Sequence, residues 1–425
     1  MWNAEPAGRR DNLTCPFCGL ACDNLRGAGD GHLVEPTGCR SADDAFSSIA
    51  HLPPSTPAIR GRPVPLVEAL QHAAGLVHAA HAPLFAGLVT DVNGMRAVLD
   101  LADRCGAVLD HHNGDALFRN LLVLQDGGWM TTTLTEARNR ADLILMVGNQ
   151  CLREFPRLIE RVLVPTEALF SSPEDRRLVW LAPPDASPVP TALQALQPIR
   201  IPVALEDLAG VAGILRGMLS GRPVRSDAVS GIPGGSLVDL AERLRVARYA
   251  LVIWAAAELD FPHAELTVQA LVELVRDLNE TTRAAALPLS GTLGDLTASQ
   301  VCTWQIGYPL RVGLQQGRAT YDPMLNRYQD LIARDECDLL VWVAALPTPS
   351  GPPPSVRPTI LLGYPGMSLD WTPEVSIPVG LPGIDHPGHW YRTDASCPLP
   401  LGRMRDLGLP SVAEVIAGLK ERLPC

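Results

Sequence analysis

The chain has 425 residues, of which 47% are hydrophobic and 19% are charged, so its composition excludes an intrinsically disordered protein. The formal net charge of -11, without a basic run, argues against nucleic acid or a membrane surface as a partner. No apolar run reaches the roughly 18 residues of a membrane span, and residues 1–12 lack the apolar core of a secretory signal, so we expect a cytoplasmic protein.

The first 52 residues form a small cysteine-rich segment that ends in the proline-rich stretch HLPPSTP, which is typical of a domain boundary. Cys15, Cys18 and Cys22 stand in a C-x2-C-x3-C array, and Cys39 follows in PTGCRSAD. Thiolates at this spacing can surround one face of an iron–sulfur cubane that a distant fourth cysteine completes. Zinc also binds four thiolates, usually in paired C-x2-C units. We predict metal binding by these cysteines, as a [4Fe-4S] cluster or zinc, with an empty ligand set as the alternative.

From residue 53 onward, short apolar runs alternate with segments of helical spacing. Each apolar run is continuous, which is typical of a parallel sheet covered by helices on both faces. We expect an α/β lobe at 53–216, a second at 217–374 and a C-terminal segment at 375–425 that closes the core. Residues 217–236 are expected to form a connecting loop. The predicted strands lie at 82–90, 142–150, 176–184, 249–259, 284–294, 337–347 and 358–366, and the predicted helices at 65–80, 92–106 and 263–280.

The loops that follow such strands usually collect ligands, because they lie at the carboxyl edge of the sheet. Here they contain the residues 149–150, 258–260, 290–291 and 347–349. No G-x-G-x-x-G or Walker A sequence is present, so the pattern argues against the dinucleotide and P-loop chemistries. No G-x-S-x-G elbow is present either, and no serine or cysteine stands out as a nucleophile.

Two histidine motifs are candidates for metal sites. In DHHNGD (110–115), His111 and His112 are neighbours that would point to opposite faces of a strand, so a shared ion is disfavoured. In IDHPGHWYRTDAS, a turn brings His386 and His389 within reach of each other, but a structural role is favoured, and Arg392 and Asp394 are expected to form an ion pair. We expect the remaining cysteines to be small buried hydrophobes; these are Cys105, Cys151, Cys302, Cys337, Cys397 and Cys425.

Several segments together resemble the B subunit of formylmethanofuran dehydrogenase, a molybdopterin oxidoreductase of the dimethyl-sulfoxide-reductase type. They are CPFCGLACDN with Cys39, LADRCGAVLDHH, LLVLQDGGWMTTTLTEARNRADLILMVGNQ, WQIGYPLRVGLQQGRATYDP and IPVGLPGIDHPGHWYRTDAS. The resemblance covers most of the chain and implies a multi-lobe α/β fold with parallel sheets and a small N-terminal cysteine-rich lobe. It also implies an iron–sulfur cluster on Cys15, Cys18, Cys22 and Cys39.

One departure from that family changes the expected activity. The dehydrogenase pattern has a Cys-His pair, whose cysteine ligates tungsten or molybdenum, where this chain has Ala116 and Leu117. Neither residue supplies a metal ligand or a base, so the resemblance implies that the catalytic metal and its pterin are absent. The crevice for that cofactor is then expected to be empty or partly filled by side chains.

The departure fits the B subunit of the formyltransferase/hydrolase complex of methylotrophic bacteria. That complex takes formyl groups from tetrahydromethanopterin through a methanofuran-like (methylofuran) carrier to formate, with the chemistry on its A and D subunits. We therefore expect a non-redox scaffold without catalytic residues, partnered by the A, C and D subunits. Arg153, Arg157 and Arg161 are candidates for binding the carrier.

Two alternatives stay open at this point. The first is an active formylmethanofuran dehydrogenase B subunit whose metal ligand comes from elsewhere, for example from Asp115. The retained cysteines motivate it, because an iron–sulfur cluster has its obvious use in electron transfer. The second is an isolated iron–sulfur or zinc protein, which the length of the chain makes less favourable.

Overall fold

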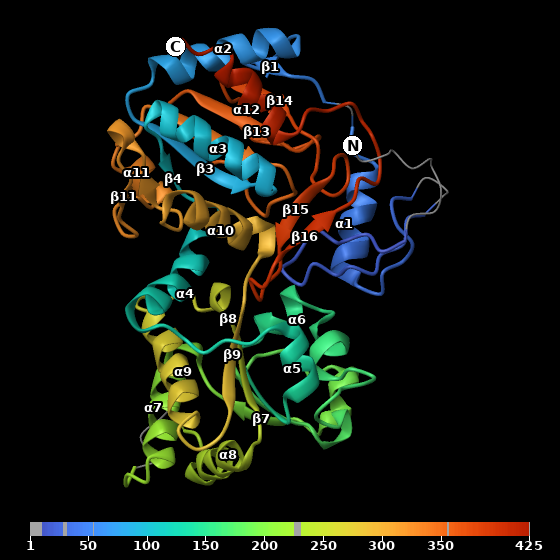
Figure 1. Cartoon of the computed structure of the whole chain (residues 1–425), viewed down its shortest axis with the longest axis vertical. Coiled ribbons are helices and arrows are strands. Elements are labelled where there is room, and N and C mark those ends of the chain that lie inside the picture. Colours follow the sequence, from blue (N-terminus) through green and yellow to red (C-terminus); the bar gives the residue numbers. More distant parts are fainter. Residues whose placement is uncertain (1–10, 29–31, 54, 225–230, 355–356, 425) are drawn as a thin grey trace. The chain divides into compact units, whose positions relative to one another are not determined.

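The computed structural model describes residues 11–28, 32–53, 55–224, 231–354 and 357–424. The chain divides into two compact units (Figure 1). Unit 1 combines residues 1–114 with residues 291–425, and unit 2 is the continuous segment 115–290. Each of the expected α/β lobes, 53–216 and 217–374, contributes residues to both units, and the four-part division stays a prediction.

Unit 1 is built on a nine-stranded sheet whose strand order is β11-β10-β4-β3-β12-β13-β14-β1-β2. The five central strands are parallel, and the strands at both edges pair antiparallel. β3 and β12 are fully buried apolar runs, as the sequence pattern predicts for a sheet covered on both faces. The strands are β1 (Ala58–Ile59), β2 (Arg62–Pro63), β3 (Pro83–Val89), β4 (Val108–Leu109), β10 (Val312–Gly313), β11 (Thr320–Tyr321), β12 (Leu339–Ala344), β13 (Thr359–Gly363) and β14 (Val375–Pro378).

Helices α2, α3, α10 and α12 of unit 1 pack on one another, with α3 between α10 and α12 (Figure 1). α3 begins where the Asp91 carboxylate accepts bonds from the amides of Asn93 and Gly94, and it ends at Gly106, whose φ of 72° is left-handed. The helices are α1 (Arg40–Ala50), α2 (Leu66–Ala79), α3 (Val92–Cys105), α10 (Asp295–Ile306), α11 (Tyr328–Ala333) and α12 (Val412–Lys420). A hairpin of β15 (Gly388–Tyr391) and β16 (Pro398–Leu401) contacts α3 and α10.

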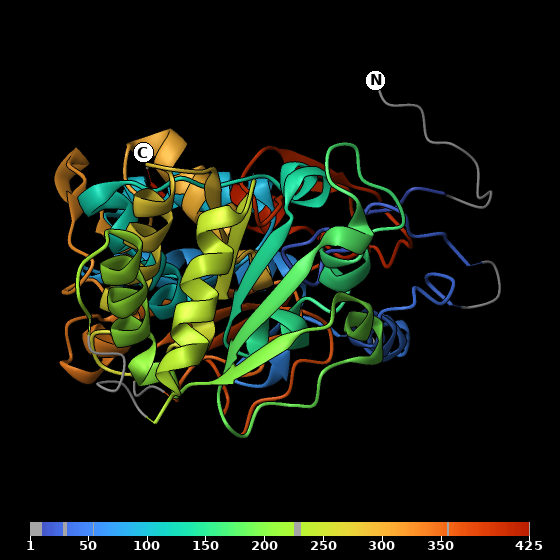
Figure 2. The same ribbon diagram turned by 90° about the horizontal axis from the view of Figure 1, so that it is seen from below.

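Unit 2 contains an all-parallel sheet of strand order β7-β6-β5-β8-β9. Figure 2, seen from below, shows the strands side by side with the yellow-green and yellow helices along one face. The strands are β5 (Leu143–Val147), β6 (Arg177–Ala182), β7 (Ile199–Pro202), β8 (Ala250–Ala255) and β9 (Ala284–Leu289). The helices are α4 (Gly114–Gly127), α5 (Leu134–Arg140), α6 (Gln150–Glu154), α7 (Leu208–Leu219), α8 (Gly234–Val246) and α9 (Glu265–Leu278).

The chain order of unit 2 reverses at its middle strand. β6 and β7 extend the sheet to one side of β5, and β8 then returns to the other side. The loops after β5 and β8 therefore diverge at this reversal point, which is where ligands usually bind in open α/β sheets.

The stretch 217–236, expected to be a loop, is shorter in the structure. α7 continues to Leu219 and α8 begins at Gly234, so only part of the stretch lies outside helices. The apolar face of α7 packs against α9, and this tertiary contact outweighs the glycines of its last turns. In the described part of the chain, no helix has both the length and the apolar character to cross a membrane.

Candidate functional site

The cysteine-rich segment folds around two short antiparallel contacts. Leu13 pairs with Leu25, and the amide of Cys15 donates to the carbonyl of Cys22 at 2.8 Å. Between them the chain turns where the Ala21 amide bonds the Cys18 carbonyl at 3.1 Å. The loop closed by these contacts carries three of the four predicted ligands, Cys15, Cys18 and Cys22.

The fourth cysteine is held by the start of α1. Cys39 is the residue before the helix, and its amide donates to the Thr37 hydroxyl at 3.0 Å. Thr37 in turn donates through its amide and its hydroxyl to one oxygen of Asp43, both at 2.8 Å. Asp43 thus fixes the backbone on which Cys39 stands, a contact that the sequence pattern did not reveal.

The four thiols lie close enough to influence one another. Burial raises the pKa of Cys15 well above its usual value, and the neighbouring Cys18, Cys22 and Cys39 raise it further, against a lowering by the Phe17 amide. Cys15, Cys22 and Cys39 are buried, while Cys18 is partly exposed. Four neighbouring thiolates, three of them buried, would repel one another, so an ionised set requires a bound cation or cluster to stabilise it.

The spacing of these thiols bears on what could bind. Within the described residues, no three His, Cys, Asp or Glu side chains are grouped closely enough to hold one metal ion. A tetrahedral zinc at about 2.3 Å from each sulfur needs the four sulfurs within about 4 Å of one another. A cubane spreads its thiolates further apart, because each binds a different iron. Four thiols are the donor chemistry of a cluster, and binding of a cluster by these cysteines stays a prediction.

The position where the resemblance expects a Cys-His pair is on α4. Leu117 is buried, with 4% of its surface exposed, and Ala116 beside it is half-buried. Methyl and isobutyl groups provide neither a ligand atom nor a proton acceptor. The segment keeps its helical geometry at this point, but these two side chains supply no metal ligand, and Asp115 is the neighbouring residue of α4 with a carboxylate.

The reversal point of unit 2 is occupied by a side chain of the unit itself. Glu258, in the loop after β8, accepts the Asn149 amide at 2.8 Å on each carboxylate oxygen and the Gln150 amide at 2.9 Å. Gly148, with φ of 79°, approaches so closely that a Cβ there would overlap Glu258 Oε2. Backbone amides in such a turn are a usual anion-binding feature, and here the anion is the protein's own carboxylate.

Other polar groups surround this carboxylate in unit 2. Trp180 Nε1 donates to the Gly148 carbonyl at 2.6 Å, which fixes the turn from the neighbouring strand β6. Burial raises the pKa of Glu154 and raises that of the Cys151 thiol well above its usual value, with Glu258 adding to both shifts. Cys151 is therefore held as a neutral thiol, which makes it a poor nucleophile.

His111, His112 and His386 of the two histidine motifs contact residues other than the four cysteines. Burial lowers the pKa of His111 to about 3, and its Nε2 lies 3.2 Å from the Leu293 carbonyl. His112 stacks edge-on against Trp342 with ring centroids 6.1 Å apart. His386 bonds the carbonyls of Gly380 and Pro387, while His389 is exposed on β15.

Two smaller predictions can be compared with the structure. The Arg392–Asp394 ion pair is confirmed, with bonds of 3.0 and 2.8 Å from the guanidinium to the two carboxylate oxygens. The expectation that the scattered cysteines are all buried holds for Cys151, Cys302 and Cys337 but is wrong for Cys397, which is exposed. Cys397 follows a surface turn that Ser396 and Asp394 organise, so it has no core to enter. Cys105 is partly exposed, and Cys425 lies outside the described residues.

No protein-family model matches the chain. Among curated proteins, it is 30% identical over 327 residues to the B subunit of the formyltransferase/hydrolase complex Fhc of Methylorubrum extorquens, an alignment that covers 76% of this chain and 85% of that relative. The chain belongs to the family that contains this Fhc protein and the B subunit of formylmethanofuran dehydrogenase. The B subunit of tungsten-containing formylmethanofuran dehydrogenase 2 from Methanocaldococcus jannaschii is 27% identical over 412 residues, 93% of each chain.

Two solved structures match the chain. The structure superposes on a chain of the formyltransferase/hydrolase complex (FhcABCD) from Methylorubrum extorquens in complex with methylofuran, with a TM-score of 0.75 and 28% identity. That match covers 86% of this chain and 98% of the other. Acetylene hydratase from Pelobacter acetylenicus matches with a TM-score of 0.65 at 10% identity, covering 97% of this chain and 69% of that one, and shares the fold alone. The predicted molybdopterin-oxidoreductase-like fold is confirmed.

Proposed function

We propose that this chain is the non-redox B subunit of a formyltransferase/hydrolase complex, which takes formyl groups from tetrahydromethanopterin through a methanofuran-like carrier to formate. The observation that carries the proposal is Ala116–Leu117, where the dehydrogenase pattern has a metal-binding cysteine and its histidine. Without the thiolate and histidine at these two positions, oxidation at a pterin-bound metal lacks the pair that the dehydrogenase pattern supplies. The 30% identity to the corresponding Methylorubrum extorquens protein supports the same conclusion.

The occupied reversal point of unit 2 supports the loss of a pterin cofactor. A cofactor whose phosphate used the amides of Asn149 and Gln150 would first have to displace Glu258. The carboxylate makes three amide contacts and is braced by Gly148, so displacement is costly.

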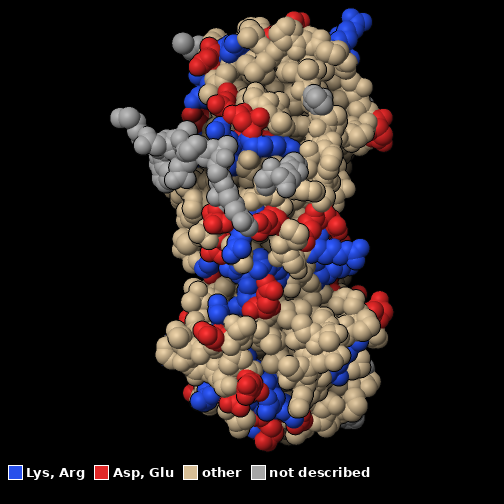
Figure 3. Space-filling view, turned by 90° about the vertical axis from the view of Figure 1, so that its right-hand side faces the viewer, with Lys and Arg blue, Asp and Glu red and all other residues tan. Residues whose placement is uncertain are grey.

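In this proposal the chain is a scaffold, with the A, C and D subunits as its partners and with the chemistry on A and D. Binding of the carrier by Arg153, Arg157 and Arg161 is part of the proposal. Arg157 already pairs with Glu160 at 2.5 Å, so a glutamate-bearing carrier would compete with that ion pair. Figure 3 shows basic and acidic side chains interspersed on one face of the molecule, which favours such local contacts over a single charged field. Action in the cytoplasm stays a prediction.

We also propose that Cys15, Cys18, Cys22 and Cys39 hold a [4Fe-4S] cluster. Its support is the closed 15–22 loop, the placement of Cys39 through Thr37 and Asp43, and the mutual influence of the four thiols. A bound cluster would supply a rigid crosslink of the lobe and a potential electron carrier. The protein's own contribution is to bury and position the thiolates.

The test is the anaerobically purified complex, analysed for metals and by EPR, and assayed for formate release from formyl-tetrahydromethanopterin without an electron acceptor. We expect about four irons per chain, no tungsten or molybdenum, and acceptor-independent formate. Cys18→Ser should remove most of the iron, whereas the buried Cys302→Ser in α10 is the matched control and should keep it. Stoichiometric tungsten or molybdenum would overturn the non-redox proposal, and unchanged iron in Cys18→Ser would overturn the cluster.

The second candidate, an active dehydrogenase subunit with Asp115 as the metal ligand, is favoured by the retained cysteine array. It requires a pterin metal in the purified complex and formate formation that stops without an electron acceptor. An Asp115→Asn variant separates the two candidates, because it should lose the pterin metal only if Asp115 binds it.

A further inference from the structure

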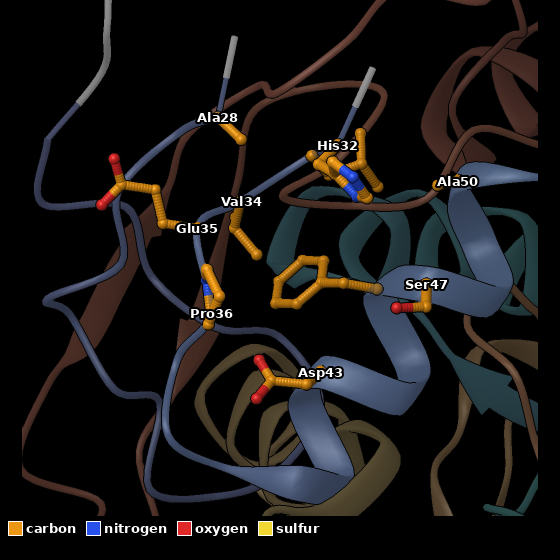
Figure 4. Close-up of a pocket in the computed structure, with 10 residues that line it drawn as sticks. Ala28, His32, Val34, Glu35, Pro36, Asp43, Ser47 and Ala50 are labelled. Atoms are coloured by element: carbon orange, nitrogen blue, oxygen red, sulfur yellow. The ribbon is translucent and has the colours of Figure 1, made fainter. Parts of the chain in front are cut away.

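A pocket of about 420 Å³ lies in the cysteine-rich lobe, between α1 and residues 32–36. One face of α1 forms one wall through Asp43, Phe46, Ser47 and Ala50, which recur at helical spacing. Figure 4 shows Val34 and Pro36 on the opposite wall. Its volume lies in the range of small-molecule sites.

The lining combines an apolar surface with negative charge. Six of the ten described lining residues are apolar: Ala28, Leu33, Val34, Pro36, Phe46 and Ala50. Of the same ten, two are carboxylates, Asp43 and Glu35, and none is lysine or arginine. In Figure 4 the Asp43 carboxylate points from α1 toward Pro36, while that of Glu35 turns away. Asp43 is therefore the charge that a ligand in the pocket would meet.

The hydrogen bonding and burial of Asp43 suit its carboxylate to binding a cation. One oxygen, Oδ1, accepts both bonds from Thr37, while Oδ2 accepts no bond from the residues that the structure describes. The side chain is half-buried, so an ion pair there would be screened less than at the surface. Phe46 is 4% exposed and lies in the apolar wall, where an aromatic face can also attract a cation.

We propose that this pocket binds a small organic ammonium ion with an apolar, ring-sized body. The ammonium group would pair with Asp43, and the body would fill the space between Phe46, Val34 and Ala50. The pocket is distinct from the four cysteine side chains, none of which lines it.

The pocket is nevertheless coupled mechanically to the cysteine array. Asp43 fixes Thr37, whose hydroxyl accepts the amide of Cys39. Phe46 packs edge-on against Phe17, with ring centroids 4.8 Å apart. In the sequence, Phe17 stands between Cys15 and Cys18. A bound ligand that displaces Asp43 or Phe46 would therefore also shift the residues around the cysteines.

The test is titration calorimetry of the full-length chain, in the assembly in which it purifies, with benzylamine as the probe. We expect saturable binding with a dissociation constant of about 1 mM, the scale for a ligand of about eight non-hydrogen atoms. Benzyl alcohol, with the same ring and no charge, should bind at least tenfold more weakly. The proposal is overturned if benzylamine does not saturate, or if benzyl alcohol binds equally well.

Four variants locate the site. Asp43→Asn should weaken benzylamine binding about tenfold, and Asp44→Asn, the neighbouring surface carboxylate that pairs with Arg40, should leave it within twofold. Because Asp43→Asn also disturbs Thr37, a second variant is needed: Ala50→Phe fills the pocket and should abolish binding. Ser48→Phe adds the same ring to an exposed position of α1 outside the pocket and should bind normally. Normal binding by Ala50→Phe would overturn the assignment.

Discussion

The Glu258 carboxylate lies against the Asn149 amide, with both oxygens 2.8 Å from the same nitrogen. The two residues come from loops after neighbouring strands, β5 and β8, at the point where the strand order of unit 2 reverses. A carboxylate that bridges this point closes the place where such sheets usually hold an anionic ligand.

Replacing Glu258 by Gln should destabilise the chain. Gln keeps the shape but loses the charge and turns an NH2 group toward amide donors, so we expect the free energy of unfolding to fall by about 1.5 to 3 kcal/mol. Urea unfolding measures the loss. Glu280→Gln, at an exposed position of unit 2, is the control and should change it by less than about 0.5 kcal/mol. Equal stability of the two variants would show that the amide contacts contribute nothing.

Adding a methyl group at Gly148 should disrupt the same contact from the other side. Gly148→Ala forces a left-handed backbone on alanine and pushes the new Cβ into Glu258, so we expect a loss of about 2 to 4 kcal/mol. Gly213→Ala, in α7 with open space around its Cβ, should instead stabilise by about 0.5 to 1 kcal/mol. If Glu258→Ala does not reduce the cost of Gly148→Ala, the steric explanation is wrong.

His111 should make the folded chain sensitive to mild acid. Burial lowers its pKa to about 3, whereas the unfolded chain titrates near 6.5. Between these values the unfolded state binds the extra proton, so stability is full above pH 6.5 and falls as the pH decreases. We expect His111 to contribute a loss of about 1.5 kcal/mol between pH 6.5 and 5.

The measurement is urea unfolding across this pH range. His111→Gln removes the titrating group, so its stability should depend less steeply on pH, whatever its absolute value. His263→Gln, at an exposed position of unit 2, serves as the control and should keep the original slope. An unchanged slope in His111→Gln would contradict the role of this residue.

Arg176 should be irreplaceable by lysine. It is fully buried, and its guanidinium donates to the carbonyls of Val162, Leu163 and Arg138. Burial lowers its pKa to about 10, so it stays charged at neutral pH. Lysine cannot reach three carbonyls at once, and Arg176→Lys should cost about 2 to 4 kcal/mol of unfolding free energy.

The neighbouring Arg177 is exposed and gives the matched control. Arg177→Lys should change the unfolding free energy by less than about 0.5 kcal/mol. Because Arg176 holds the end of the helical turn Ile159–Leu163, Arg176→Lys should also speed proteolytic cleavage near residues 164–172. Cleavage at an unchanged rate would place the effect elsewhere.

The longer central strands could be predicted from the sequence because they are buried apolar runs, whereas short or exposed edge strands such as β2 and β11 could not. β5 and β12, for example, fall within the segments 142–150 and 337–347 that the pattern predicts. The parallel arrangement followed from the same runs, since only strands covered on both faces lack polar alternation. The division into two units did not follow, because no local signal tells that residues 291–425 return to the sheet begun by residues 58–109.

Some features of the candidate sites could likewise be predicted from the sequence, and others could not. The four cysteines were visible because their spacing is local, and the placement of Asn149 and Glu258 after strands was visible as a general rule. Their direct contact was not, because it depends on which strands are neighbours and on a left-handed turn at Gly148. The role of Arg176 could not be predicted, because its partners are backbone carbonyls, and every residue has one.

Unit 1 contains residues from both ends of the chain, so its neighbouring strands are synthesised far apart in time. β3 lies between β4 and β12, and β12 leaves the ribosome only after all of unit 2 has been made. At about 5 to 20 residues per second, the apolar edge of β3 waits on the order of 10 to 50 s for its neighbour. During that interval unit 2 can complete its own parallel sheet, while the apolar edge of β3 has no partner strand.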